Sequence, residues 1–310
     1  MILLDLRSIE TEKQNPHTMN LDQMSIKEAL TVMNNEDKKV TEAIEEVIPE
    51  IESAIHIIVN QLRKGGRLIY TGAGTSGRLG VLDAAECPPT FGTPKEKVVG
   101  LIAGGQKAFT EAIEGSEDNQ EMGKEDLIDL GLNANDVVVG LAASGRTPYV
   151  IGALTYANEI KVPTVAISCN KNSEIGQVAN IAIEAVSGPE VLTGSTRLKA
   201  GSTQKMILNM LSTVSMVGIG KVYKNLMVDV QPTNEKLITR AENIVMRATD
   251  VDRDTAINKL AESDGKVKVA IIMILLDIDK EAAVKKLEES EGHIRIAVDQ
   301  YYENHKEETK

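Results

Sequence analysis

Five short apolar segments, separated by longer segments with helical periodicity, limit most strongly how this chain can fold. Runs of this length that are rich in β-branched side chains suit buried parallel strands, and the stretches between them suit helical crossovers. The sequence therefore predicts an α/β fold, with a doubly wound five-stranded parallel sheet flanked by helices. Ligands of such sheets bind at the carboxyl ends of the strands, so we expect function in the loops there. The predicted strands are residues 67–70, 98–103, 136–142, 163–168 and 180–186.

The segments on either side of the sheet are expected to be helical. Apolar residues between Val40 and Leu62 recur at helical spacing, which favours a core or a dimer interface over a ligand site. The polar residues 1–24 suit a surface arm. After residue 225 short amphipathic helices follow one another, and turn residues around the apolar run 269–276 assign it to a helix. Three domains are predicted: an N-terminal arm with helices that pack on the core (1–64), the sheet domain (65–225) and a small all-helical domain (226–310).

The composition argues against several classes of partner. The 310 residues carry a net charge of -12, and only 3% are aromatic, which disfavours nucleic acid and acidic membranes. The apolar residues 1–4 are too few for a signal sequence, and no apolar run approaches the roughly 20 residues of a membrane span. Two cysteines fit a reducing cytoplasm. Four scattered histidines offer no metal-ligand spacing, so neither a metal nor a cofactor is predicted.

A glycine-rich segment follows the first predicted strand. Residues 72–77 match the G-x-G-x-x-G pattern of dinucleotide sites. Such a site needs an acidic residue at the end of the second strand, but residues 101–105 contain no carboxylate. Glycines admit a close ligand, and the hydroxyl groups suit a phosphomonoester. We therefore expect Thr75, Ser76 and Gly77 to bind a phosphate, although this pattern alone has low specificity.

A second hydroxyl and glycine segment follows the third predicted strand. It contains Ser144, Gly145, Arg146 and Thr147, and Pro148 after it is typical of a helix start. Hydroxyl and N–H groups from two such loops can surround a phosphate, so the pair is a stronger signal than either loop alone. The structural alternative is that both loops are ordinary helix caps.

A third candidate anion site precedes a Met-rich helix expected over residues 202–224. Ser195, Arg197 and Lys199 place a hydroxyl group and two cations before that helix. The functional interpretation is an anion clamp, and the alternative is a capped helix with a solvated basic end.

Two glutamates are candidate acid–base groups. Glu86 is predicted to be the last residue of a helix over 78–86 that Pro88 and Pro89 stop, where its carboxyl group would be partly withdrawn from water. Glu117 lies in an acidic loop after the second strand. Taken alone, such a loop is more often solvated surface.

These motifs together resemble a known family. The two hydroxyl and glycine loops on a five-stranded parallel sheet resemble the sugar isomerase (SIS) family of phosphosugar-binding domains. The finer pattern is similar to the N-acetylmuramic acid 6-phosphate etherase family, over nearly the whole chain. The matching segments are Thr11-Glu12, Asn15-Pro16 and residues 72–77, 86–91, 114–118, 143–148 and 188–205.

The resemblance implies an activity and roles for the residues. The implied enzyme is a carbon–oxygen lyase that needs no cofactor and acts on a small-molecule phosphosugar in amino sugar catabolism and peptidoglycan recycling. It would cleave the D-lactyl ether at C3 of N-acetylmuramic acid 6-phosphate by elimination and then hydration, giving N-acetylglucosamine 6-phosphate and D-lactate. Glu86 would protonate the departing ether oxygen and later activate water, and Glu117 would act at C2. Ser195, Arg197 and Lys199 are further anion ligands, for the phosphate or for the lactyl carboxylate.

Helix geometry adds a prediction about assembly. A helix from Gly77 to Glu86 separates these residues by roughly 13 Å, so Glu86 is far from a phosphate at its own helix start. We therefore expect a homodimer with the active site near the subunit interface. Two alternatives remain: a regulatory protein that binds phosphosugars without catalysis, like the glucokinase regulator, and an aldose–ketose phosphosugar isomerase. The single predicted sugar domain and the two glutamates disfavour the first, and the C-terminal helices disfavour the second.

Overall fold

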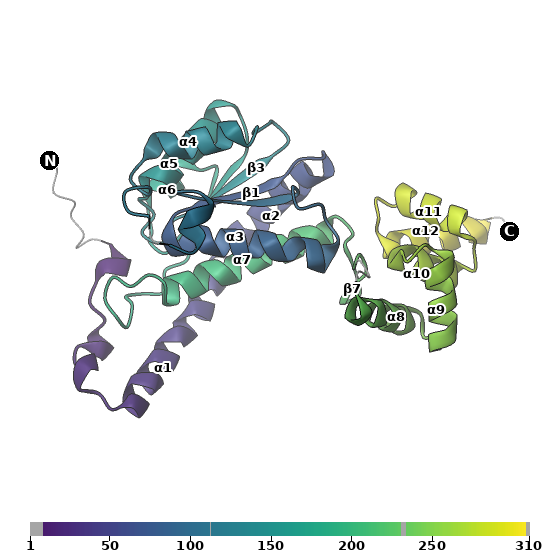
Figure 1. Cartoon of the computed structure of the whole chain (residues 1–310), viewed down its shortest axis with the longest axis horizontal. Coiled ribbons are helices and arrows are strands. Elements are labelled where there is room, and N and C mark those ends of the chain that lie inside the picture. The colour runs from purple at the N-terminus through teal and green to yellow at the C-terminus, as the bar shows by residue number, and fades with distance from the viewer. Residues whose placement is uncertain (1–8, 112, 231–233, 308–310) are drawn as a thin grey trace. The chain divides into compact units, whose positions relative to one another are not determined.

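The computed structural model of the chain describes residues 9–111, 113–230 and 234–307 (Figure 1). The apolar residues 1–4 and the last three residues of the tail lie outside this part. Contacts divide the chain into two compact units, one of residues 1–85 with 95–212 and the other of residues 86–94 with 213–310. Helices α3 (Gly74–Phe91) and α7 (Lys199–Gly218) contribute residues to both units. The three predicted domains remain a proposal.

The first unit contains a five-stranded parallel sheet in the order β2-β1-β3-β4-β5, which confirms the predicted fold class. Every residue of the three central strands is buried, as expected for strands covered on both faces. Gly72 at the end of β1 lies opposite Ile102 of β2 and Leu141 of β3, so these strands end at the same edge. The strands are β1 (Leu68–Gly72), β2 (Val98–Ile102), β3 (Val137–Leu141), β4 (Thr164–Ser168) and β5 (Ile181–Glu184).

Helices cover both faces of this sheet. Figure 1 shows α4, α5 and α6 on one side, and α2, α3 and α7 on the other. A capping box starts α1, because Ser25 and Glu28 exchange hydrogen bonds there. The remaining helices of this unit are α1 (Ile26–Glu45), α2 (Ile48–Arg63), α4 (Gln120–Asp129), α5 (Pro148–Glu159) and α6 (Glu174–Val178), with short 3-10 turns at Glu10–Glu12, Pro16–Thr18, Leu21–Gln23 and Gln106–Phe109.

The prediction of a helix that begins at Arg78 and is stopped by Pro88 and Pro89 is wrong at both ends. Helix α3 begins four residues earlier, at Gly74, and both prolines lie inside it. The φ angle that a proline ring imposes is compatible with a helix. Each proline removes a hydrogen-bond donor and crowds the preceding turn, but it need not end the helix. The helix ends instead at Gly92, which adopts φ +61° and donates its N–H to the carbonyl oxygen of Pro88.

The second unit is a helical bundle with one short hairpin. The predicted helical character is confirmed over α8–α12, and the run 269–276 lies in α10 as expected. The Met-rich helix, α7, ends at Gly218 rather than near residue 224. The hairpin that follows was not predicted, because strands of two residues are too short to show a periodic pattern. The elements are β6 (Val222–Tyr223), β7 (Leu226–Met227), α8 (Glu235–Thr249), α9 (Arg253–Glu262), α10 (Val267–Leu276), α11 (Lys280–Glu289) and α12 (Ile294–Glu307).

A tandem repeat of 27 residues builds this bundle. Residues 251–277 form α9 and α10, and residues 278–304 form α11 and most of α12 with the same pattern. In both copies an aspartate caps the first helix, and a buried serine donates a hydrogen bond to a carbonyl oxygen three residues before it. The equivalent pairs include Asp252 with Asp279, Ala256 with Ala283, Leu260 with Leu287, Ser263 with Ser290 and Gly265 with Gly292.

The close crossing of α4 and α5 gives a stability test. A Cβ atom on Gly152 of α5 would lie 1.9 Å from the carbonyl oxygen of Gln120. We expect Gly152→Ala to lower the free energy of unfolding by about 1–3 kcal/mol in urea denaturation, because the helices must separate. Glu159→Ala, at an exposed position of the same helix, should change it by less than about 0.5 kcal/mol. Equal stability of Gly152→Ala and the wild type would contradict the close approach.

Candidate functional site

The candidate site begins where β1 and β3 end. Strand β1 lies between β2 and β3. The chain leaves β1 towards β2 and leaves β3 towards β4, so these two connections run in opposite directions. Ligands of doubly wound sheets bind at such a switch point. Because Gly72 is paired with Leu141, the segments after the two strands start side by side.

The predicted first phosphate loop is mostly the first turn of α3. Thr75, Ser76 and Gly77 are helical, with Thr75 half-buried and the other two buried. A Cβ on Gly77 would lie 2.6 Å from the carbonyl oxygen of Gly72, so only glycine allows the tight entry into the helix. The start of a helix provides free N–H groups and a positive dipole end, which suit an anion. The Ser76 hydroxyl donates a 2.8 Å hydrogen bond to Oε1 of Gln204 in α7, a partner that the sequence did not indicate.

The second predicted loop leads into α5. Ser144, Arg146 and Thr147 are half-buried, and Gly145 is buried with φ +76°. Arg146 forms an ion pair with Glu174, with Nε 2.8 Å from Oε1. Pro148 stands at the start of α5 as predicted, but the Thr147 side chain makes no capping hydrogen bond. The hydroxyl group of Thr147 is therefore not used as a helix cap, which weakens the structural alternative for this loop.

Glu117 lines a pocket together with the start of α3. The pocket has a volume of about 220 Å³, and its walls include Gly74 and Arg78 of α3, Ala103 after β2, and the segment 113–117. The Glu117 side chain is exposed. Its carbonyl oxygen accepts a 3.0 Å hydrogen bond from Tyr149 N, which ties the Glu117 peptide to the start of α5. The structure thus brings Glu117 to the start of α3 and, through its backbone, beside the second loop.

Arg78 also lines this pocket, although it was not among the predicted site residues. Its guanidinium donates to the carbonyl oxygens of Phe109 and Glu111, each at 3.0 Å. These bonds fix one wall of the pocket, which is also lined by Glu111, Glu114 and Glu117. A basic residue directly after the glycine-rich segment was the available signal.

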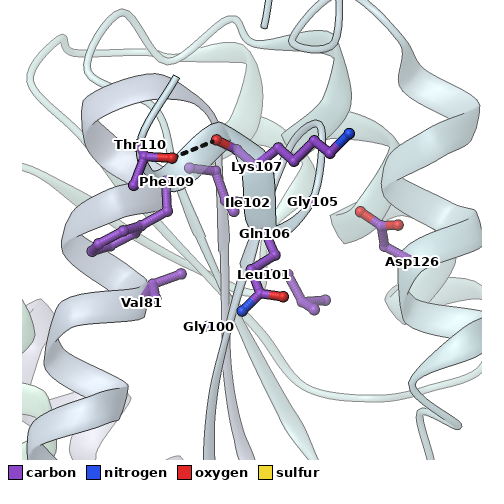
Figure 2. Close-up of a pocket in the computed structure, with 10 residues that line it drawn as sticks. All are labelled: Val81, Gly100, Leu101, Ile102, Gly105, Gln106, Lys107, Phe109, Thr110 and Asp126. Atoms are coloured by element: carbon purple, nitrogen blue, oxygen red, sulfur yellow. Dashed lines mark hydrogen bonds between the residues drawn. The ribbon is translucent and has the colours of Figure 1, made fainter. Parts of the chain in front are cut away.

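A larger hollow lies beside β2, at the edge of the sheet. Figure 2 shows it between Val81 of α3, Gly100–Ile102 of β2 and the turn that carries Lys107 and Phe109. Its volume is about 680 Å³. None of the predicted site residues lines it. The turn Gln106–Phe109 contributes residues to this hollow and to the Glu117 pocket.

Glu86 lies on the part of α3 that belongs to the second compact unit. Its side chain is exposed, whereas Asp83 and Cys87, one turn apart, are buried. The expected partial withdrawal of Glu86 from water is therefore absent from the described chain, because Glu86 occupies the solvent side of the helix.

Lys199, predicted to be an anion ligand, is a fully buried cation instead. Its Nζ lies 2.7 Å from Oε2 of Glu36 in α1. Burial alone would raise the pKa of Glu36, but hydrogen bonds from Lys199, Lys39, His17 and Asn15 outweigh it and hold that pKa well below its usual range. The backbone N–H of Lys199 also donates to Glu190. Of the third predicted cluster, Arg197 is exposed and Ser195 is half-buried, so these two remain accessible.

Most residues of the described arm, 9–24, are exposed or half-buried as predicted, but a few buried side chains anchor it to the rest of the chain. Thr11 and Asn15 are buried, and Asn15 donates hydrogen bonds to Glu36 and to the carbonyl oxygen of Pro189. Asn170, after β4, accepts from Glu10 N and donates to the carbonyl oxygen of Ala143. The arm is thus tied to the second loop and to the segment before α7.

The described residues also bear on metal binding and on membrane insertion. In residues 9–111, 113–230 and 234–307, no group of three or more His, Cys, Asp or Glu side chains is arranged to hold a metal ion. Over the same residues, no helix is both long enough and apolar enough to cross a membrane.

Comparisons with known proteins show which family this chain belongs to. Residues 50–158 match the glucokinase regulatory protein N-terminal SIS domain, and residues 121–214 match the SIS domain. An N-acetylmuramic acid 6-phosphate etherase of Lactococcus lactis subsp. lactis is 61% identical over 87% of this chain and 91% of its own length. N-acetylmuramic acid 6-phosphate etherase 2 of Enterococcus faecalis is 59% identical over 87% of this chain and 92% of its own length. A phosphoheptose isomerase of Neisseria gonorrhoeae is similar in structure, with a TM-score of 0.48 and 17% identity over 62% of this chain and 98% of that chain.

The buried Glu36–Lys199 pair gives a pH test. Because the folded-state pKa of Glu36 is lowered, its contribution to stability is complete above about pH 4.5 and is lost as the pH falls further. We expect Glu36→Gln to lower the free energy of unfolding by about 3–5 kcal/mol at pH 7, since it leaves Lys199 unpaired. The difference from the wild type should narrow between about pH 4.5 and pH 3.

The matched control is Glu42→Gln, an exposed position of the same helix, which should match the wild type at every pH. A difference between Glu36→Gln and the wild type that stays constant down to about pH 3 would exclude the lowered pKa.

Proposed function

Because the chain belongs to the N-acetylmuramic acid 6-phosphate etherase family, we propose that it cleaves the D-lactyl ether at C3 of N-acetylmuramic acid 6-phosphate. The products are N-acetylglucosamine 6-phosphate and D-lactate, and the reaction class is that of a carbon–oxygen lyase. The observation that carries this proposal is the meeting, at the β1/β3 switch point, of two hydroxyl-bearing helix starts with a pocket lined by Glu117. Such a site suits a phosphosugar whose carbon chain reaches a carboxylate.

The proposed reaction is an elimination followed by a hydration. Opening of the sugar ring gives an aldehyde, which acidifies the proton on C2. Glu117 removes that proton, a C2–C3 double bond forms, the C3–O bond breaks, and Glu86 protonates the departing lactate oxygen. Water activated by Glu86 then adds to C3, and a proton returns to C2. General acid–base groups of this kind need no metal or cofactor to complete the proton balance.

The two helix starts are proposed to anchor the phosphate. Thr75, Ser76 and Gly77 supply N–H and hydroxyl donors from the first turn of α3, and the segment 144–147 supplies more from the start of α5. Ser195 and Arg197 are proposed for the lactyl carboxylate. Lys199 is now proposed to hold their segment in place through Glu36, because its own ammonium group is buried.

We further propose a homodimer in which Glu86 reaches a sugar bound mainly by the partner copy. Two features support this proposal: α3 is continuous from Gly74 through Glu86, which separates the two along the helix by roughly 18 Å, and the Glu86 side chain is exposed. A cytoplasmic location is proposed as well, since two cysteines are too few for a disulfide scaffold and suit a reducing compartment.

A phosphosugar-binding regulator is the second candidate. The match of residues 50–158 to the N-terminal SIS domain of the glucokinase regulatory protein favours it. The two candidates differ in turnover: a regulator binds the sugar phosphate tightly without releasing D-lactate.

The first test measures D-lactate released from N-acetylmuramic acid 6-phosphate. The wild type should release it, and Glu86→Gln and Glu117→Gln should each lower kcat by about 10²- to 10⁴-fold, because the amide cannot transfer the proton. The Kd for N-acetylglucosamine 6-phosphate should change less than about threefold, since neither side chain is assigned to the phosphate. Glu125→Gln, exposed on α4, is the control with unchanged kcat. Full turnover by either site variant would remove that glutamate from its role.

The second test asks whether the two glutamates of one site come from different subunits. Glu86→Ala and Glu117→Ala protein are each inactive, but after subunit exchange one of the two sites in every mixed dimer regains both carboxylates. Random mixing should then restore about one quarter of wild-type activity. No recovery in a mixture shown by tagged pull-down to contain mixed dimers would place both glutamates in the same subunit.

A further inference from the structure

We propose that Gln204 is a positioning residue of the phosphate pocket, whose amide decides whether the Ser76 hydroxyl can donate to a bound phosphate. The inference rests on the proposed function, in which Ser76 belongs to the phosphate anchor. Gln204 lies in α7, the helix that follows the Ser195–Lys199 segment.

The contact is buried and incomplete. Gln204 is 0% exposed and Ser76 is 6% exposed. Oε1 of Gln204 accepts the Ser76 hydroxyl at 2.8 Å, but Nε2 has no hydrogen-bond partner among the residues that the structure describes. A buried amide N–H without an acceptor costs free energy, so this arrangement is not the best one that the two side chains can form.

The two helices are held together around this contact. Buried Asp83 of α3 accepts hydrogen bonds from Tyr70, from Asn209 at 2.8 Å and from Ser212 at 3.1 Å, the last two on α7. These bonds hold the middle of α3 against α7, about two helical turns after the contact between Ser76 and Gln204. The amide group can still rotate, because the terminal torsion of glutamine is broad and roughly two-fold.

A serine hydroxyl has one proton to donate. While that proton points to Oε1 of Gln204, Ser76 cannot donate it to a phosphate, which accepts hydrogen bonds and donates few or none at neutral pH. Rotation of the amide by about 180° exchanges its oxygen and nitrogen. Nε2 then donates to the Ser76 oxygen, and the Ser76 proton is free to reach a phosphate oxygen.

The rotated state also gives the buried Nε2 an acceptor. It leaves Oε1 without a donor, and an under-satisfied carbonyl oxygen is more readily tolerated than an orphaned N–H. Phosphate binding and amide rotation therefore favour each other. Gln204 acts through Ser76, and a chain of contacts runs from the segment before α7 to the first turn of α3.

Two substitutions separate this role from packing. Gln204→Glu accepts a hydrogen bond but cannot donate one when ionised, so it keeps the Ser76 proton and adds a negative charge. Gln204→Met has a similar shape and can do neither. We expect Kd for N-acetylglucosamine 6-phosphate, measured by calorimetry, to rise at least about tenfold in Gln204→Glu, because its carboxylate keeps the Ser76 proton. In Gln204→Met the Kd should rise about threefold to tenfold, because no Nε2 donor orients the Ser76 oxygen. The matched control is Thr203→Val, a buried isosteric change on the same helix whose hydroxyl bonds only to the carbonyl oxygen of Lys199.

The readouts distinguish positioning from stability. Unphosphorylated N-acetylglucosamine should bind every variant as it binds the wild type, and Gln204→Met should have no further effect when combined with Ser76→Ala. Equal losses for the phosphorylated and unphosphorylated sugars, or additive effects of the two substitutions, would overturn the proposal.

A measurement that needs no substitution at Gln204 covers the case in which the Gln204 variants do not fold. In wild-type protein labelled with ¹⁵N-glutamine, inorganic phosphate should shift the side-chain NH₂ signals of Gln204, and Ser76→Ala should abolish the shift. Unmoved signals at saturating phosphate would refute the rotation. A wild type that releases no D-lactate but shows the Gln204 effects would reject the etherase proposal alone, whereas an active wild type without those effects rejects only this inference.

Discussion

The parallel pairing of β1 with both of its neighbours is the interaction on which the proposed site depends. Because Gly72 lies opposite both Ile102 and Leu141, the three strands end at the same edge of the sheet. The helices that begin there turn their free N–H groups towards that edge, and the segment after β2 carries Glu117 to it. Strand order and register therefore bring the proposed anion anchor and the proposed acid–base residue Glu117 to the same edge of the sheet.

Two neighbouring cations of the chain have different surroundings, which the charge pattern of the sequence does not reveal. Lys199 is buried, whereas Arg197, two residues before it, is exposed. A buried ion pair is stable only when its remaining hydrogen-bonding capacity is satisfied, and Glu36 receives four side-chain partners. This network joins α1, the N-terminal arm and the start of α7, so it fixes the backbone from which Arg197 projects.

The strands, the glycine turns and the helical run 269–276 could be predicted from the sequence because their signals are local. The burial of Lys199 could not, since its partner Glu36 lies 163 positions away, and Gln204 and Ser76 are 128 positions apart. The prolines of α3 misled the prediction because their usual effect on a helix is strong. The 27-residue repeat was present in the sequence, but equivalent residues of its two copies make different contacts: Lys268 pairs with Asp229, whereas the equivalent Arg295 lies over the ring of Tyr223.

The discontinuity of the second compact unit has a consequence for biosynthesis. Residues 86–94 belong to this unit, but the rest of it begins only at residue 213. On the ribosome the end of α3 therefore emerges long before its packing partners, such as Asp229, whose carbonyl oxygen leaves no room for a Cβ on Gly92. The first unit can complete its sheet before the packing partners of this end of α3 are synthesised. The surroundings of Glu86 are therefore among the last parts of the chain to form. A chain that ends before residue 213 would therefore leave the Glu86 end of α3 without the rest of its compact unit.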